Sequence, residues 1–110
     1  QERHALGLPP YTYMALLRAD SRTPEHATSF LHGIQRSLSA QIAGTHVQAI
    51  GPMPALMERR AGRHRAHLLF KSTHRKPLHS LLEATLMSIA TGKTPSGLRW
   101  SIDVDPQESV

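Results

Sequence analysis

Hydrophobic and polar positions follow one another in an order that predicts four strands and two helices. Strands are expected at 11–20, 47–50, 64–71 and 99–104, where apolar side chains alternate with polar ones or occupy both faces. Two helices are expected in which apolar residues recur every three or four positions. They include Ala27, Phe30, Leu31, Ile34 and Leu38 in the first, and Leu78, Leu81, Leu82, Leu86 and Ile89 in the second.

This β-α-β-β-α-β order favours an α+β fold, a ferredoxin-like sandwich in which two helices cover one face of a four-stranded sheet. The first strand carries Tyr13, Ala15 and Leu17 on one face and Met14 and Leu16 on the other, as a central strand does. Met14 and Leu16 would then lie on the uncovered face, which favours a neighbouring domain or partner packed there.

Local signals place the ends of the helices. At 23–25 a Thr-Pro-Glu run supplies a capping hydroxyl and a proline at the first helical position, and Gly44 closes the region of this helix. Proline is tolerated only in the first turn of a helix, so Pro77 predicts an N-cap near His74 and a helix N-terminus at Arg75.

Composition bounds the class of protein. The 110 residues fit one domain, with 1–10 expected to be the end of a preceding region and 11–110 the domain itself. Without cysteine, disulfides and cysteine-bound zinc are excluded, which suits the cytoplasm. No apolar run approaches the ~20 residues of a membrane span. Thirteen Lys and Arg against eight Asp and Glu give a net charge of +5, which favours nucleic acid, anionic lipid or acidic protein as partner.

The most informative segment is 51–65, expected to be a loop too long for a tight hairpin. Within seven residues it carries Arg59, Arg60, Arg63 and Arg65, with His64 among them and Gly62 permitting a sharp turn. Guanidinium groups fork onto phosphate oxygens, so this spacing predicts phosphate binding. The alternative is a solvated loop whose arginines pair with acids such as Glu58 and Asp103.

Two other patterns do not support catalysis. The segment 90–94 resembles the end of a nucleotide-binding loop, but Met87 stands where that motif needs glycine, and a helix precedes it. The eight histidines do not bring three metal ligands together at any spacing. We therefore expect no catalytic residue, cofactor site or metal site in this chain.

The last strand alternates cleanly, with Trp100, Ile102 and Val104 expected to point inward. Asp103 and Asp105 share the other face and are expected to be counter-charges for nearby arginines rather than a catalytic pair. The chain also contains no asparagine, which excludes acylphosphatase, a ferredoxin-like enzyme that works with an Arg and an Asn.

Arg75 is a second candidate anion site. A helix N-terminus attracts anions through its unpaired N–H groups, and Lys71, Lys76 and His79 lie close by in sequence. Such a site would take a carboxylate from a partner as well as a phosphate. An ordinary exposed first turn remains the alternative.

Five stretches together carry a family resemblance: 8–11 (LPPY), 51–55 (GPMPA), 60–65 (RAGRHR), 68–69 (LL) and 100–106 (WSIDVDP). Over nearly the whole chain they resemble the C-terminal domain of the primosomal protein N′ (PriA) family. The resemblance implies a fold like that of a small-ribosomal-subunit protein. It also implies a parent that is an ATP-dependent, superfamily 2, 3′-to-5′ DNA helicase, which restarts stalled replication forks and loads the primosome. ATP, Mg and Zn would then belong to the helicase lobes and cysteine region that precede this domain.

The resemblance also implies roles for particular residues. Arg75 would help bind the acidic, aromatic C-terminal tail of single-stranded-DNA-binding protein, with Lys71 nearby and His79 where the family often has Gln. His64 and Ala66 stand where the family often has aromatic residues, which favours contact with the nucleic-acid backbone over base stacking.

We therefore expect a non-catalytic module that binds replication forks and single-stranded DNA through Arg59, Arg60, Arg63, His64 and Arg65. Its other expected partners are the tail of single-stranded-DNA-binding protein, other primosome proteins and the helicase lobes of its own chain, with no membrane. The alternative is a protein-docking module that packs on those lobes and captures the tail through Arg75. An RNA-binding or ribosome-associated role is a third possibility, which the motifs disfavour.

Overall fold

The computed structural model describes residues 12–60 and 62–105, with the side chains of 55–60 and 105 outside the description. The expected linker at 1–10 and the strand start at Tyr11 therefore lie outside the described residues. Within them the order is β1 (Tyr13–Ser21), α2 (His26–Ser37), α3 (Ser39–Ala43), β2 (Val47–Arg60), β3 (Arg63–Ser72), α4 (Arg75–Thr91) and β4 (Arg99–Asp105). The predicted β-α-β-β-α-β order is confirmed, and the short α3 continues the path of α2.

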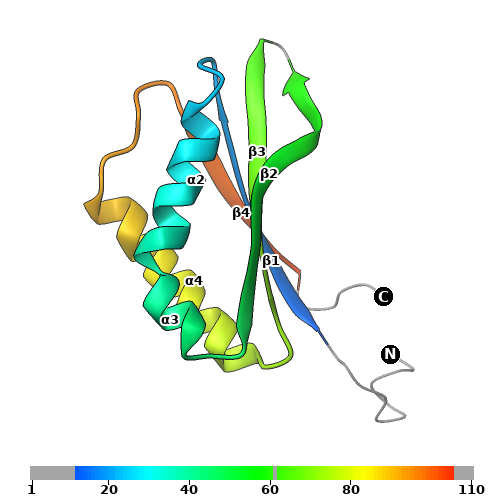
Figure 1. The fold of residues 1–110 in the computed structure, drawn as a ribbon, viewed down its shortest axis with the longest axis vertical. Helices are drawn as coiled ribbons and strands as arrows, with labels where there is room; N and C mark the ends of the chain where they lie inside the picture. The colour runs from blue at the N-terminus through cyan, green and yellow to red at the C-terminus, as the bar shows by residue number, and fades with distance from the viewer. Residues whose placement is uncertain (1–11, 61, 106–110) are drawn as a thin grey trace.

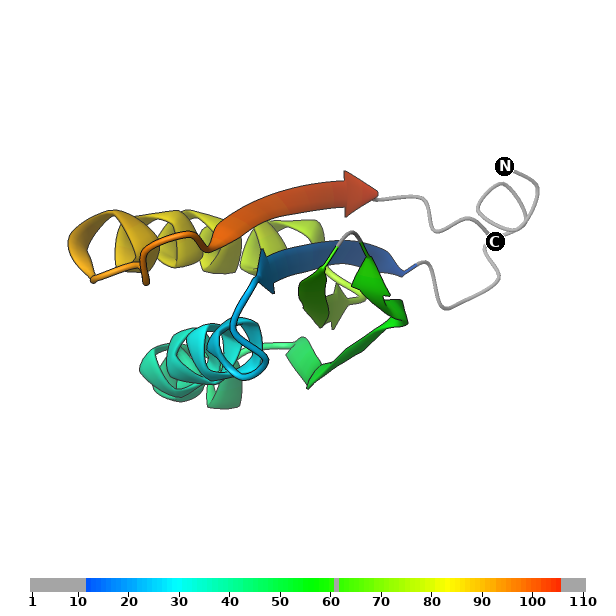
Figure 2. The same cartoon turned by 90° about the horizontal axis from the view of Figure 1, so that it is seen from above.

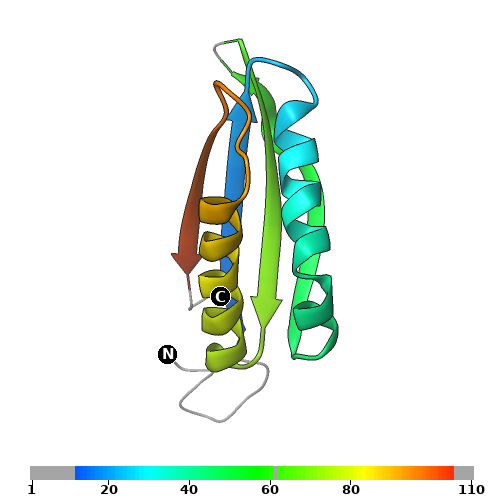
Figure 3. The ribbon, with the colours of Figure 1, turned by 90° about the vertical axis from the view of Figure 1, so that its left-hand side faces the viewer.

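The four strands form one sheet in the order β2-β3-β1-β4, and every neighbouring pair is antiparallel. This is the ferredoxin-like arrangement expected from the sequence. Both long helices lie on one face of the sheet, and within residues 12–60 and 62–105 no helix lies on the other, which we call the uncovered face (Figures 1 and 2). Seen from the helix side, α4 lies in front of β1 and α2 in front of β2, with β3 visible between the two helices (Figure 3).

The core lies between this sheet and the helices. Successive strand residues point to opposite faces, so Ala15, Leu17 and Ala19 of β1 meet Leu68 and Phe70 of β3 on the covered face. Full burial of a side chain such as that of Leu17 or Phe70 contributes about 2–3 kcal/mol. The helices close the core with Ala27, Leu31, Ile34, Leu78, Leu81, Leu82 and Ile89.

The apolar face of α4 differs from the predicted one at one position. Thr85 is fully buried, and its hydroxyl donates a hydrogen bond of 2.8 Å to the carbonyl oxygen of Leu81, so this buried hydroxyl is paired. Leu86, expected among the core-facing residues, is 48% exposed. The buried stripe of α4 passes through Thr85 instead.

The helix starts were predicted with mixed success. As expected, α4 begins at Arg75 with His74 as its N-cap, and Gly44 follows the end of α3. The predicted cap by the hydroxyl of Thr23 is wrong. Helix α2 begins at His26 after an N-cap residue, Glu25, that makes no side-chain capping bond. Here the backbone carbonyl of Thr23 accepts the His26 N–H at 3.2 Å instead.

Strand β2 contradicts two expectations. It does not stop at Gly51-Pro52 but continues to Arg60, so the predicted loop at 51–65 is mostly strand. The pairing with β3 shifts between Ile50 and Met53, and the proline sits inside this irregularity, where the missing N–H breaks no regular ladder bond. Arg60 then pairs with Arg63, so β2 and β3 form a tight hairpin.

Strand β4 lies at an edge of the sheet, which limits its burial. Trp100 and Val104 pair with Ala19 and Ala15, so they do lie on the covered face. They nevertheless remain 36% and 49% exposed. Ile102 in the middle of the strand packs against the core.

Candidate nucleic-acid interface

A hairpin at one end of the sheet carries the four arginines singled out in the sequence. We call this segment, from residue 59 of β2 to residue 65 of β3, the arginine hairpin. Its backbone pairs Arg59 with His64 and Arg60 with Arg63. Gly62, at the turn, has φ of 77°, a conformation that other residues adopt reluctantly. The side chains of Arg59 and Arg60 lie outside the described residues, so their expected role stays a prediction.

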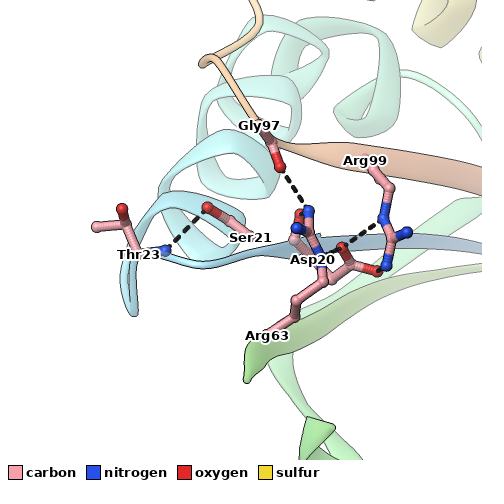
Figure 4. Close-up of polar contacts among 6 residues, drawn as sticks. All are labelled: Asp20, Ser21, Thr23, Arg63, Gly97 and Arg99. Carbon is pink, nitrogen blue, oxygen red and sulfur yellow. Dashed lines mark hydrogen bonds and ion pairs between the residues drawn. The ribbon is translucent and has the colours of Figure 1, made fainter. Parts of the chain in front are cut away.

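Arg63 holds the base of this hairpin against the rest of the fold (Figure 4). Its side chain is only 13% exposed. Its Nε donates to Oδ1 of Asp20 at 2.5 Å, and one Nη donates to the carbonyl oxygens of Asp20 at 3.3 Å and of Gly97 at 2.5 Å. The arginine thus joins β3, the end of β1 and the segment before β4.

Asp20 accepts hydrogen bonds from a second arginine as well. Arg99 Nε lies 3.1 Å from Oδ1 and its Nη 3.4 Å from Oδ2, while 69% of the Arg99 side chain remains exposed. Burial by itself raises the pKa of Asp20, but hydrogen bonds and charges from Arg99 and Arg63 outweigh it and hold this pKa below its usual value. One carboxylate therefore serves two guanidinium groups.

Arg65 lies on the uncovered face, where β2 departs from regular pairing. After Pro54 pairs with Ala66, β2 resumes regular pairing only at Arg59, opposite His64. Four residues of β2, 55–58, therefore span the length that a single residue, Arg65, occupies on β3. The backbone partner of Arg65 on its other side is Asp20.

A pocket of about 220 Å³ lies on the uncovered face beside Arg65. Its lining includes Arg18, Arg65, His67, Arg99 and Ser101. Burial, followed by the charges of Arg18 and Arg65, lowers the pKa of His67, so its imidazole stays neutral near pH 7. We call this the arginine pocket.

Sequence reasoning named Arg65 but missed Arg18 and Arg99. The sequence shows that residues two apart on a strand share a face. Only the register between strands, however, places Arg18 and Arg99 beside Arg65. Arg18 pairs with Asp103 at 2.7 Å, which confirms the expected counter-charge role of that carboxylate. With side chains 49% and 57% exposed, this pair contributes at most about 1 kcal/mol.

The residues expected to hold a partner tail are not all brought together. Arg75 and His79 are exposed and lie four positions apart on α4, so they share a side of this helix. Lys71, however, is in register with Met14 and Gln48 on the uncovered face of the sheet, opposite the helices. A depression of about 280 Å³ beside it is lined by Thr12, His46, Gln48, Lys71, Ser72 and Thr73.

His74 stacks on His46 with ring centroids 4.3 Å apart. Across residues 12–60 and 62–105, no three His, Asp or Glu side chains gather closely enough to hold a metal ion. Over the same part of the chain, no helix combines the length and the apolar character that crossing a membrane requires.

Comparison with known proteins identifies relatives over nearly the whole chain. Residues 4–107 match the family model described as "Primosomal protein N C-terminal domain". The chain is 38% identical over 109 residues to the replication restart protein PriA of Haemophilus influenzae. That alignment covers 98% of this chain but 14% of the relative, so the chain spans about a seventh of the relative's length.

Solved structures support the fold alone. The de novo designed protein Foldit4 superposes with a TM-score of 0.61 at 13% identity, covering 86% of this chain and 96% of that one. A hydantoinase/carbamoylase family amidase from Burkholderia ambifaria matches at 15% identity over 94% of this chain and 31% of its own, with a TM-score of 0.44 that is too low to bear on the fold.

Proposed function

Because the chain belongs to the primosomal protein N C-terminal domain family, we propose that it is the DNA-binding and partner-docking domain of a replication restart protein. The observation that carries the DNA-binding role is the arginine hairpin. It gathers Arg59, Arg60, Arg63 and Arg65 around one tight turn. Arginine supplies planar, permanently charged donors, which suit phosphate oxygens.

The hairpin divides its arginines between two tasks in this proposal. Arg63 is a positioning residue, since Asp20 and Gly97 already accept its hydrogen bonds and most of its side chain is buried. Arg59, Arg60 and Arg65 contact phosphates, and His64 supports them at the same turn. Contacts of this kind recognise the backbone of forked or single-stranded DNA without reading its sequence.

Fluorescence anisotropy across a salt series tests this role with forked, duplex and single-stranded DNA. We expect salt-sensitive binding that Arg59→Glu/Arg60→Glu abolishes. The matched control is Arg36→Glu/Lys93→Glu, which reverses the same number of charges at exposed positions on the helix side. Equal losses in the two variants would mean that only net charge matters, and a clear preference for structured RNA over forks would replace DNA as the ligand.

A second role, capture of the acidic tail of single-stranded-DNA-binding protein, rests on α4. Arg75 and His79 project from exposed positions one turn apart, beside an N-terminus where unpaired N–H groups favour a carboxylate. Arg75→Ala is expected to abolish binding of an acidic, aromatic peptide while DNA affinity stays unchanged. The opposite pattern would contradict this role.

We extend the proposal to the longer protein that such a domain serves. On the family resemblance, the parent is an ATP-dependent DNA helicase whose other domains hold ATP, Mg and Zn, and its helicase lobes and other primosome proteins are partners of this domain. An apolar part of the uncovered face, with Met14, Leu16 and Leu69 around a depression of about 470 Å³, gives the lobes a surface to contact.

A further inference from the structure

We propose that the arginine pocket on the uncovered face of the sheet holds one phosphodiester group of the nucleic-acid strand that the arginine hairpin binds. This inference rests on the proposed DNA-binding function and adds a contact that the arginine cluster at 59–65 does not predict. Two of its three arginines, Arg18 and Arg99, come from strands β1 and β4.

The pocket has the size and lining for such a group. Its volume of about 220 Å³ is about seven times the share of one water in the liquid, which leaves room for a phosphate with part of its hydration. Guanidinium groups of Arg18, Arg65 and Arg99 surround it, and the hydroxyl of Ser101 adds a further donor. Phosphate oxygens accept several hydrogen bonds at once, and this lining offers several donors.

Three guanidinium groups, those of Arg18, Arg65 and Arg99, and one carboxylate, Asp20, are among the side chains that line the pocket. Asp20 is shared between Arg63 and Arg99, and Asp103 is paired with Arg18. Arg65, in register with Asp20 on β1, brings the third guanidinium of the lining. His67, in register with Arg18 on β1 and Met53 on β2, has its pKa lowered by burial and then by Arg18 and Arg65. The part of this shift that comes from Arg18 and Arg65 reflects positive potential at His67.

Continuity with the hairpin favours a nucleic-acid strand over an acidic peptide. Arg65 follows Arg63 by two residues on β3, which is about 7 Å along the strand. A strand held at the turn therefore reaches the pocket without leaving the surface. The pocket is lined mainly by charged and polar side chains, whereas an acidic, aromatic tail also needs an apolar recess for its rings.

Three variants separate this inference from the proposed function. Arg18→Gln/Arg99→Gln alters the pocket without touching the hairpin, Arg59→Glu/Arg60→Glu alters the hairpin, and Arg36→Gln/Lys93→Gln removes two charges from the helix side as a control. Anisotropy with forked and single-stranded DNA is measured across a salt series, and urea unfolding verifies that each variant is folded. The single variant Arg99→Gln perturbs the pocket less, because Asp20 keeps its ion pair with Arg63.

We expect the pocket variant to lose about tenfold in affinity at low salt, with the salt slope reduced by about 0.9 on duplex and about 0.7 on single strands for one phosphate contact. The control is expected to stay within about twofold of wild type. A pocket variant that matches the control, while the hairpin variant fails to bind, overturns this inference and leaves the proposed function standing. A wild-type chain that binds no DNA overturns both.

A direct readout uses His67 as a reporter of the pocket. An anion held among the arginines offsets their charge, so inorganic phosphate and oligothymidylate should each raise the pKa of His67 in an NMR titration of its ring protons. Arg18→Gln/Arg99→Gln should remove this response. An acidic peptide that produces the response where oligothymidylate does not would overturn the assignment to nucleic acid.

Discussion

Asp20 and Arg63 are joined by a contact of 2.5 Å between Oδ1 and Nε, although 43 residues separate them in sequence. The pair connects the end of β1 to the start of β3, at the point where the arginine hairpin leaves the body of the sheet. Stability of the fold and presentation of the hairpin therefore depend on the same carboxylate.

Asp20→Asn is expected to lower the free energy of unfolding by about 2 kcal/mol, because it leaves the largely buried guanidinium of Arg63 without a charged partner. Urea unfolding followed by circular dichroism measures the loss. The control is Asp103→Asn, whose exposed pair with Arg18 is expected to contribute less than about 1 kcal/mol. Equal losses would mean that burial of the Arg63 pair has no effect.

Lowering the pH should remove the stability that the Asp20 carboxylate contributes. The pKa of Asp20 is lowered from 3.8 in the folded chain, so the unfolded chain takes up a proton at Asp20 first as pH falls. The stability from this carboxylate is complete above about pH 3.8 and is lost as pH falls through the lower, folded value. Urea midpoints of wild type and Asp20→Asn should therefore converge in acid, and a constant gap would contradict the assigned shift.

Arg75→Ala and Lys71→Ala should differ in their effect on tail binding. Arg75 begins α4, whereas Lys71 lies on the opposite face of the sheet, in register with Met14. With an acidic, aromatic peptide in isothermal titration calorimetry, Arg75→Ala is expected to weaken binding by about tenfold or more and Lys71→Ala by less than about twofold. Comparable losses would place the peptide on both faces, against this account.

Gly62→Ala should destabilise the hairpin turn. At φ of 77°, a side chain is strained although no atom lies within 4 Å of the added Cβ, so the expected loss is about 1 kcal/mol. Gly62→Asn is the matched control, because asparagine tolerates this conformation better. Thermal unfolding midpoints should rank wild type, then Asn, then Ala, and a stable Ala variant would rule out backbone strain at the turn.

Gly33→Ala should raise the free energy of unfolding. Gly33 lies inside α2, is exposed, and has no atom within 4 Å of an added Cβ. Alanine reduces the freedom of the unfolded chain and is the better helix former, so stability should rise by about 0.5–1 kcal/mol. Urea unfolding measures the gain, and a loss would reveal a contact on this side of α2.

The sequence contained enough information for the fold because its strongest signals are local. The apolar alternation of β1, the proline that places the start of α4, and the uncovered positions of Met14 and Leu16 depend on near neighbours in the chain. The order of elements then admits few topologies. Residues 12–21 and 75–91 were predicted well for this reason.

Non-local features account for what was missed. The continuation of β2 past Gly51-Pro52 depends on an irregular register with β3, which no local pattern reveals. The alternative considered for the arginines of 51–65 was pairing with acids such as Glu58 and Asp103, whereas Arg63 pairs with Asp20 from another strand. Arg99 and Arg18 join Arg65 only because β4 and β3 flank β1 in the sheet. Such neighbours become visible only when strand order and register are both known.

The two ends of the sheet carry different features. Met14 pairs with Asp105, so β1 begins and β4 finishes side by side, while the turn at Gly62 lies at the far end of the sheet (Figure 1). The ten residues of β3 span roughly 30 Å. If the end of the sheet where β1 begins is fixed to another part of the protein, a tilt of the sheet by about 10° would move the arginine hairpin, roughly 30 Å away, by about 5 Å. Small rotations at that end of the sheet therefore produce larger displacements of the arginine hairpin.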